Sequence, residues 1–185
     1  MHDTFTTFSD LPVSKPPFRR IPFKEAMLKY GSDKPDLRNP LIIIDLSDFF
    51  AKVDFPAFKG KIVRAIRVPG AAKQSKRWFK DMEKYALSIG MKGLGYISVN
   101  SDLTYKGPID KFMTDEQKKE IAQLAELQPD DVLYFISDEK DVVAKYAGQI
   151  RTEVAKRLVM IDTERFEFCY IVVFPMFESN EETGK

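Results

Sequence analysis

Closely spaced turn signals between short strands and amphipathic helices are the feature that most limits how this chain can fold. Residues 61–68 are rich in β-branched side chains and stop at Pro69-Gly70, which predicts a strand. Residues 75–89 carry Trp78, Met82, Tyr85 and Ile89 at helical spacing, which predicts a helix with one apolar stripe. Pro-Gly and Asn-rich turns separate several strands closely. The pattern therefore favours an α+β fold, a two-layer sandwich with a mostly antiparallel sheet and helices packed on one face.

The remaining elements follow from the same kinds of signal. Further strands are predicted at residues 41–46, 95–99, 132–136 and 166–174, and the continuous apolar run of the last is typical of the middle of a sheet. Further helices are predicted at residues 23–30, 114–127 and from 138 or 139 to about 158, the second opening on a capping box at 114–117. Residues 1–20 are polar and punctuated by proline, which predicts an extended connector.

Composition excludes several classes of protein. Fifteen Phe, seven Tyr and one Trp are too many aromatic residues for a disordered chain. No apolar run approaches the roughly 18 residues of a membrane-spanning helix, and the N-terminus lacks the pattern of a secretory signal. Cys169 is the only cysteine, which excludes a disulfide framework and a zinc site built on cysteine pairs. We therefore expect a cytoplasmic protein with no membrane partner and no metal site.

Histidine chemistry is also not expected, because the only histidine, His2, lies in a polar tail beside the initiating methionine. The sequence consequently offers no candidate catalytic residue of its own. The glycine-rich stretch at residues 90–95 leaves a helix and opens a strand, the reverse of a phosphate-binding loop, and is interpreted as a helix cap followed by a tight turn.

Basic residues are concentrated in one stretch although the net charge of the chain is only +1. Residues 56–80 hold eight basic side chains and no acidic one, and with no local acidic partner they form a candidate contact surface for nucleic-acid phosphate. A solvated charged face is the alternative, and at helical spacing Trp78 is more typical of a core residue than of a base-stacking one. The eight candidates are Lys59, Lys61, Arg64, Arg67, Lys73, Lys76, Arg77 and Lys80. Residues 110–141 are acidic by contrast, with ten Asp or Glu against four Lys.

A second candidate site lies in the proline-bounded loop at residues 32–40, where Asp33, Lys34, Asp36 and Arg38 are crowded together. Such loops can hold charged groups rigidly for ligand recognition. Composition alone favours the other interpretation, a turn whose charges pair internally.

Several long motifs resemble the bacterial-type aspartyl-tRNA synthetases, which are class II aminoacyl-tRNA synthetases. The most specific is the run FRRIPFKEAMLKYGSDKPDLRNP at residues 18–40. The sequences RVPG at 67–70, KGLGYI at 92–97 and RFEFCYIVVFPMFE at 165–178 are similar to the same family. The resemblance covers nearly the whole chain, and the cysteine–aromatic pair at 169–170 looks most like the alphaproteobacterial branch.

The resemblance implies an architecture. It assigns residues 1–40 to a connector and a flank of the catalytic domain, residues 41–160 to the GAD insertion domain, and residues 161–185 to a re-entry strand and a polar tail. The GAD domain also occurs in the B subunit of the amidotransferase that converts mischarged tRNA. The Arg-x-Glu pattern of Arg165 and Glu167 fits motif 2 of the class II synthetases but is interpreted as surface charge. Because no credible motif 1, 2 or 3 of that class is present, the chain looks like an excised piece.

The resemblance also implies a function. The parent family activates aspartate with ATP and Mg²⁺ and transfers it to tRNA, and the parent is expected to be a homodimer. This piece alone is expected to be a monomer that binds no cofactor and is inactive. By resemblance, Ser32, Asp33 and Lys34 border the pocket for the aspartyl adenylate, while the insertion domain supports contact with the acceptor side of tRNA. The alternatives are a purely structural spacer and an amidotransferase-type GAD module.

Two departures from the family pattern lie near the end of the chain. The family usually carries Asp before Phe-Pro in the re-entry strand, where this chain has Val173, and Trp after the final Phe-x-Glu, where it has Ser179. Val suits a strand better than Asp, so the first departure does not affect the expected fold.

Overall fold

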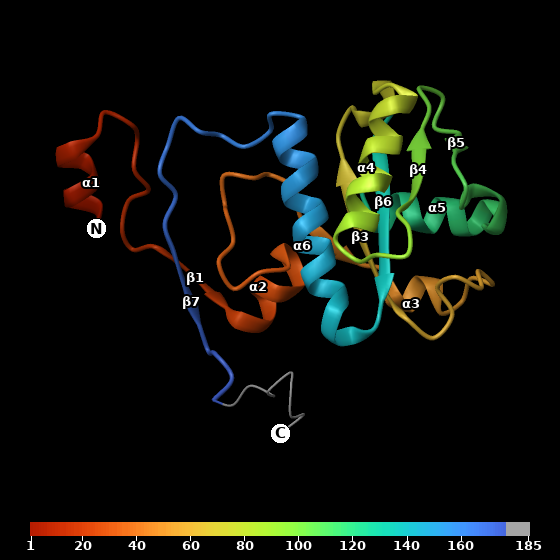
Figure 1. Cartoon of the computed structure of the whole chain (residues 1–185), viewed down its shortest axis with the longest axis horizontal. Helices are drawn as coiled ribbons and strands as arrows, with labels where there is room; N and C mark the ends of the chain where they lie inside the picture. Colours follow the sequence, from red (N-terminus) through yellow and green to blue (C-terminus); the bar gives the residue numbers. More distant parts are fainter. Residues whose placement is uncertain (177–185) are drawn as a thin grey trace.

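The computed structural model describes residues 1–176 and, for Asp141, the backbone alone. The helices are α1 (His2–Phe8), α2 (Phe23–Tyr30), α3 (Ser47–Phe50), α4 (Lys76–Ser88), α5 (Asp115–Leu124) and α6 (Lys140–Arg157), with 3-10 turns at Ala71–Lys73 and Asp110–Phe112. The strands are β1 (Arg19–Pro22), β2 (Ile43–Asp45), β3 (Ile62–Val68), β4 (Gly95–Val99), β5 (Tyr105–Lys106), β6 (Val132–Asp138) and β7 (Cys169–Val172). Figure 1 shows α1, β1 and β7 at one end of the molecule, the larger sheet at the other, and α6 between them.

The larger sheet has five strands in the order β2-β3-β6-β4-β5, and every pairing in it is antiparallel. Its longest pairing joins β3 to β6, from Ile62 opposite Asp138 to Val68 opposite Val132. The predicted α+β class and antiparallel sheet are therefore confirmed.

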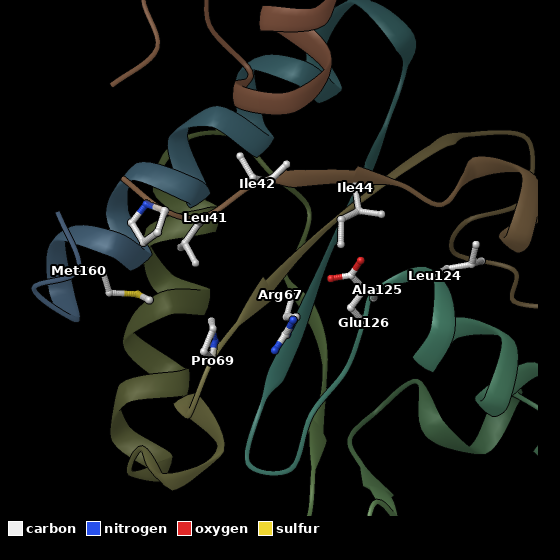
Figure 2. Close-up of a pocket in the computed structure, with 10 residues that line it drawn as sticks. Leu41, Ile42, Ile44, Arg67, Pro69, Leu124, Ala125, Glu126 and Met160 are labelled. Carbon is white, nitrogen blue, oxygen red and sulfur yellow. The ribbon is translucent and has the colours of Figure 1, made fainter. Parts of the chain in front are cut away.

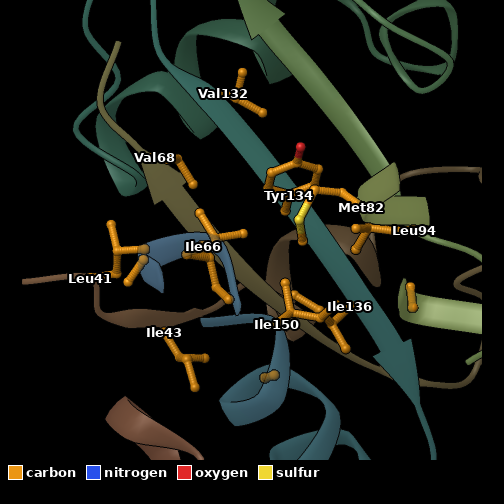
Figure 3. Packing of buried hydrophobic residues seen from close by; sticks show 14 of the residues in the cluster. Leu41, Ile43, Ile66, Val68, Met82, Leu94, Val132, Tyr134, Ile136 and Ile150 are labelled. Carbon is orange, nitrogen blue, oxygen red and sulfur yellow. The ribbon is translucent and has the colours of Figure 1, made fainter. Parts of the chain in front are cut away.

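Helices cover both faces of this sheet. Tyr134 and Ile66 face α4 and α6, the two longest helices, which share one face of the sheet (Figure 3). Leu133 and Phe135 point the other way, toward α3 and α5, because side chains alternate along a strand. The expected layer of helices on one face is present, and α3 and α5 add a smaller layer on the other. The central strand β6 is consequently buried on both sides from Val132 to Ile136.

The sequence signals for helix ends act as expected. The Ser75 side chain accepts a hydrogen bond from the Trp78 N–H and begins α4, and Thr114 and Gln117 form the capping box of α5. Trp78 packs against the core beside Tyr134, which confirms its assignment as a core residue.

The prediction that residues 166–174 form a central strand is wrong. They contribute β7, which pairs only with β1, in parallel, in a separate two-stranded sheet. Within the described part of the chain no strand pairs with its other edge. Tyr170 in β7 and Phe174 just after it are about half exposed, at 50% and 51%. An apolar run indicates that a strand favours burial, but it does not show whether other elements of the fold lie beside the strand and bury it.

The predicted connector at residues 1–20 contains a helix, α1, that the sequence interpretation missed. Its Phe5 ring packs edge-on against Phe166 and Phe168, with ring centroids 4.7 and 5.0 Å apart. Val13 also forms an isolated parallel bridge with Phe166. Contacts with residues distant in sequence thus order a segment whose local composition is polar.

Among the helices of residues 1–176, none combines the length and the apolar character that a bilayer crossing requires.

Tyr134→Phe is expected to raise the free energy of unfolding by about 1 kcal/mol. The Tyr134 side chain is fully buried, and its hydroxyl has no hydrogen-bond partner within the described residues. Burial raises the pKa of this phenol, and the unpaired hydroxyl loses its hydration on folding without compensation. Urea unfolding measures the change. Tyr105→Phe is the matched control, because the Tyr105 hydroxyl donates to the Lys118 carbonyl at 3.0 Å and its loss should destabilise the chain. A comparable loss of stability in both variants would contradict the prediction.

Candidate functional site

The loop at residues 31–41 is held against α6 by a direct backbone contact. Gly31 ends α2 in the left-handed conformation, with a φ of +67°, and its N–H donates to the Met27 carbonyl. A Cβ added to Gly31 would lie 2.5 Å from the backbone nitrogen of Gly148 in α6, and one added to Gly148 would lie 2.5 Å from the Gly31 carbonyl oxygen. Both positions require glycine, since no side chain fits between the two backbones.

A buried arginine on α6 organises the rest of the loop. Arg151 is only 2% exposed. Its Nε donates to the Leu41 carbonyl at 2.6 Å, and its Nη2 donates to the carbonyls of Asn39 at 2.9 Å and Asp36 at 3.1 Å. Asn39, also 2% exposed, donates from Nδ2 to the Arg151 carbonyl. One guanidinium therefore satisfies three loop carbonyls that would otherwise be buried without donors.

The charge of Arg151 is balanced by carbonyl dipoles and an aromatic face. Its guanidinium carbon lies 5.1 Å from the centroid of the Tyr30 ring, within cation–π range. Burial lowers the pKa of Arg151 from its ordinary value. Asp36 is nearby but forms a two-pronged ion pair with Arg38, with both distances at 2.9 Å, and this hydrogen bonding lowers the pKa of Asp36. The loop thus contains an internal ion pair, as the composition suggested.

The structure separates the three loop residues predicted to border a substrate pocket. Ser32 and Lys34 line a cavity of about 400 Å³ between the loop and α6, and Asp33 does not. The Ser32 hydroxyl accepts a hydrogen bond from the Lys34 backbone N–H at 3.0 Å. The cavity is therefore walled by both the loop and the long helix, and from here we refer to it as the loop cavity.

The eight basic candidates in residues 59–80 do not form one surface. Arg64 pairs with Asp45, and Lys73 pairs with Asp130 at 2.8 Å. Both carboxylates come from distant parts of the chain. The lack of an acidic residue within the stretch 56–80 therefore did not mean that its basic residues lack acidic partners in the fold. Arg64 and Arg67 also point to opposite faces of the sheet, because they are three residues apart on one strand.

Arg67 has a structural partner as well. Its Nε lies 2.6 Å from Oδ2 of Asp131, a residue only 2% exposed, which also accepts hydrogen bonds from the backbone N–H groups of Gly70 and Gln128. Figure 2 shows Arg67 between Pro69 and Glu126 on the wall of an apolar pocket of about 390 Å³. Arg67 therefore ties the end of β3 to the turn before β6.

Lys73 stays exposed despite its ion pair, with a side chain 71% exposed, and the other surface candidates form two groups at opposite ends of β3. Lys59 and Lys61 lie before its first residue, while Lys76, Arg77 and Lys80 lie on α4, beyond its last. Seven residues of strand separate the two groups by roughly 20 Å. Arg77 has an exposed side chain and lies 3.8 Å from Asp81, a weak i,i+4 contact. Lys76, Arg77 and Lys80 together are called the α4 basic face below.

Arg151 and Asn39 are the residues that sequence reasoning missed. The signal for Arg151 was present: it lies four residues after Ala147 and three before Val154, on the apolar stripe of α6. An arginine inside a buried stripe must find hydrogen-bond acceptors, and the proline-bounded loop supplies them.

Comparison with known proteins agrees with this architecture. A family model described as the GAD domain matches residues 55–147, which is half of the chain. The aspartate–tRNA(Asp/Asn) ligase of Rickettsia bellii (strain OSU 85-389) is 46% identical over 190 aligned residues, covering all of this chain and 32% of that protein. The ligases of the same name from Rickettsia canadensis and Rickettsia prowazekii are 44% and 43% identical, again over the whole chain.

These relatives are alphaproteobacterial, the branch that the sequence resembled, and the chain spans about a third of their length. The family match extends from the turn before β3 into the first half of α6 and so includes most of the five-stranded sheet. The chain belongs to the GAD domain family.

Proposed function

We propose that this chain acts as the GAD insertion domain of an aspartate–tRNA ligase, together with short flanks of its catalytic domain. The observation that carries the proposal is the 46% identity to such a ligase across all of this chain. In this proposal residues 1–40 are the first flank, residues 41–160 the insertion domain, and residues 161–185 the returning flank. ATP-dependent charging of tRNA with aspartate, in the cytoplasm, belongs to the longer ligase.

The cofactors of that reaction are proposed for the longer ligase rather than for this stretch of chain. Within residues 1–176, no group of three or more His, Cys, Asp or Glu is placed to hold a metal ion. The side chain of Val173, where the family usually carries Asp, has no oxygen atom and is 78% exposed. Asp33 and Lys34 remain the best candidates for assisting at the border of the aspartyl-adenylate pocket.

The proposed protein partner is the rest of the catalytic domain. Parallel strands are usually buried on both faces, and an isolated pair of strands is marginal in water. Tyr170 in β7 and the residues that follow the strand, Val173, Phe174 and Met176, are nevertheless between 50% and 88% exposed. We infer that further strands and helices of the ligase cover these side chains. By the family resemblance the ligase would be a homodimer and this chain alone a monomer.

Contact with the acceptor side of tRNA is the proposed role of the insertion domain itself. The α4 basic face supports this role, because Lys76, Arg77 and Lys80 are all exposed and belong to one helix. The basic residues that pair with Asp45, Asp130 and Asp131 are not needed for this contact.

Binding of this chain to total bacterial tRNA is expected to fall steeply as salt rises from roughly 20 to 200 mM. Each phosphate neutralised by a basic side chain releases counterions, so a handful of contacts changes affinity by orders of magnitude over that range. Filter binding measures it. The triple reversal Lys76→Glu, Arg77→Glu and Lys80→Glu should abolish binding at the lowest salt.

A matched control reverses Lys111, Lys119 and Lys156, which are exposed residues outside the α4 basic face. The net charge changes equally, so equal losses in both triple variants would show attraction by total charge alone. Absent or salt-independent binding of the unaltered chain would favour the purely structural spacer.

A further inference from the structure

An apolar pocket of about 360 Å³ lies where β6 extends beyond the start of β4, and we refer to it as the strand-end pocket. Two lysines, Lys61 and Lys92, line it, and no Asp or Glu of the described residues does. Neither lysine forms an ion pair within residues 1–176. The pocket therefore combines an apolar interior with unopposed positive charge. Its apolar wall includes Phe55, Phe58, Leu94, Ile109 and Phe135.

The backbone of Ser137, which also lines the pocket, is not hydrogen-bonded to β3. Ser137 lies opposite Val63 of that strand. The Val63 N–H donates to the Ser47 hydroxyl at 3.1 Å, and the Val63 carbonyl accepts from the Leu46 N–H at 2.9 Å. Because both backbone groups of Val63 point away from β6, Val63 and Ser137 form a non-hydrogen-bonded pair. The N–H and carbonyl of Ser137 consequently point toward the β4 side of β6.

β4 begins too far along the sheet to use these two groups. Its first residue, Gly95, lies opposite Phe135, two residues before Ser137. In the same register Gly93 would lie opposite Ser137, but within residues 1–176 no backbone hydrogen bond joins the two. One N–H and one carbonyl of the sheet are therefore left beside the pocket without a backbone partner. An extended chain added to the edge of a sheet supplies such partners.

The register defines how an added residue would lie. A residue opposite Ser137 in a hydrogen-bonded antiparallel pair donates its N–H to the Ser137 carbonyl and accepts from the Ser137 N–H. Its side chain lies on the same face as the Ser137 and Phe135 side chains, and Phe55, Phe58 and Ile109 pack on that face. The next position in the row belongs to β4 itself, so an added chain that runs in the direction of β4 must end opposite Ser137.

We propose that the strand-end pocket binds the free C-terminus of a peptide whose last residue is large and apolar. The side chain fills the apolar interior, and the last N–H donates to the Ser137 carbonyl. The terminal carboxylate accepts from the Ser137 N–H and from the ammonium groups of Lys61 and Lys92, and such charge-assisted bonds are roughly twice as strong as neutral ones. The site goes beyond the proposed function, since no residue of the α4 basic face or of the loop at 31–41 lines it.

The test is a titration of the ¹⁵N-labelled full chain with N-acetyl-glycyl-phenylalanine, followed through the amide chemical shifts. Saturable shifts are expected at Gly93, Gly95 and Ser137. The amide-capped form of the peptide lacks the carboxylate, and the alanine form leaves the pocket unfilled, so each should bind roughly fivefold more weakly or worse. Methylation of the phenylalanine nitrogen removes the donor to the Ser137 carbonyl and should weaken binding to a similar extent.

The double variant Lys61→Ala and Lys92→Ala should weaken binding of the free acid roughly fivefold and change binding of the amide-capped form less than about twofold. Its matched control, Lys59→Ala and Lys106→Ala, removes the same charge from exposed residues that do not line the pocket. The control should bind the free acid within about twofold of the unaltered chain. Equal affinity for the acid and the amide, saturable shifts confined to other parts of the chain, or no shifts up to about 10 mM peptide would overturn the proposal.

Discussion

Gly148→Ala is expected to lower the free energy of unfolding by roughly 3 kcal/mol. The new methyl group would lie 2.5 Å from the Gly31 carbonyl oxygen and 3.0 Å from its carbonyl carbon. Both are backbone atoms at the end of α2, so no side chain can rotate away to make room. To relieve the clash, α2 must move away from α6. This movement disturbs the loop cavity and the Arg151 hydrogen bonds. Urea unfolding followed by circular dichroism measures the loss.

Gly93→Ala is the matched control for this substitution. A Cβ at Gly93 meets no atom within 4 Å, and Gly93 does not adopt a positive φ. The same chemical change should therefore alter stability by less than about 0.5 kcal/mol. If Gly148→Ala proved as mild as Gly93→Ala, the close approach of α2 and α6 would be wrong.

Arg151→Met is the second substitution with a large expected effect, a loss of about 3 kcal/mol. Methionine retains much of the apolar stem but leaves the carbonyls of Asp36, Asn39 and Leu41 without their donor. Each buried acceptor left unpaired costs roughly 1 kcal/mol or more, and removal of the cation–π contact with Tyr30 adds to the loss. Chemical denaturation gives the total. Hydrogen exchange at residues 36–41 should rise more than exchange in β6, since the loop loses its anchor first.

Arg157→Met provides the comparison on the same helix. Arg157 is an exposed residue that pairs with Glu153 at 2.6 Å, an i,i+4 ion pair expected to contribute less than about 1 kcal/mol. The difference in unfolding free energy between the two variants separates the effect of burial and carbonyl hydrogen bonding from the effect of replacing any arginine on this helix. Similar losses in both would show that Arg151 does not organise the loop.

Elements whose signals are local were predictable from the sequence. The stripe of Trp78, Met82, Tyr85 and Ile89 predicted α4, and its Met82 is fully buried. The capping box at Thr114 depends on residues three apart, and it forms as expected. Such features need no knowledge of the rest of the chain, because the interacting groups are close neighbours in sequence.

Features that join distant segments were not predictable in the same way. The apolar run containing β7 could not reveal that its partner would be β1, about 150 residues earlier and parallel to it. The basic stretch likewise gave no sign that Asp45, Asp130 and Asp131 would neutralise three of its members. In both cases the local sequence shows the apolar or basic character of the segment. The tertiary fold determines which distant residues contact it.

The parallel pairing of β1 with β7 has a consequence for how the domain is built into a larger protein. Pro22 lies opposite Val172, so the chain leaves one strand and returns on the adjacent one after about 150 residues. Both ends of the intervening module therefore lie side by side, on two neighbouring strands. A module attached in this way can be gained, exchanged or lost with little rearrangement of its host. Within the module, the Gly31–Gly148 contact and the Arg151 hydrogen bonds hold the segment next to this attachment against α6.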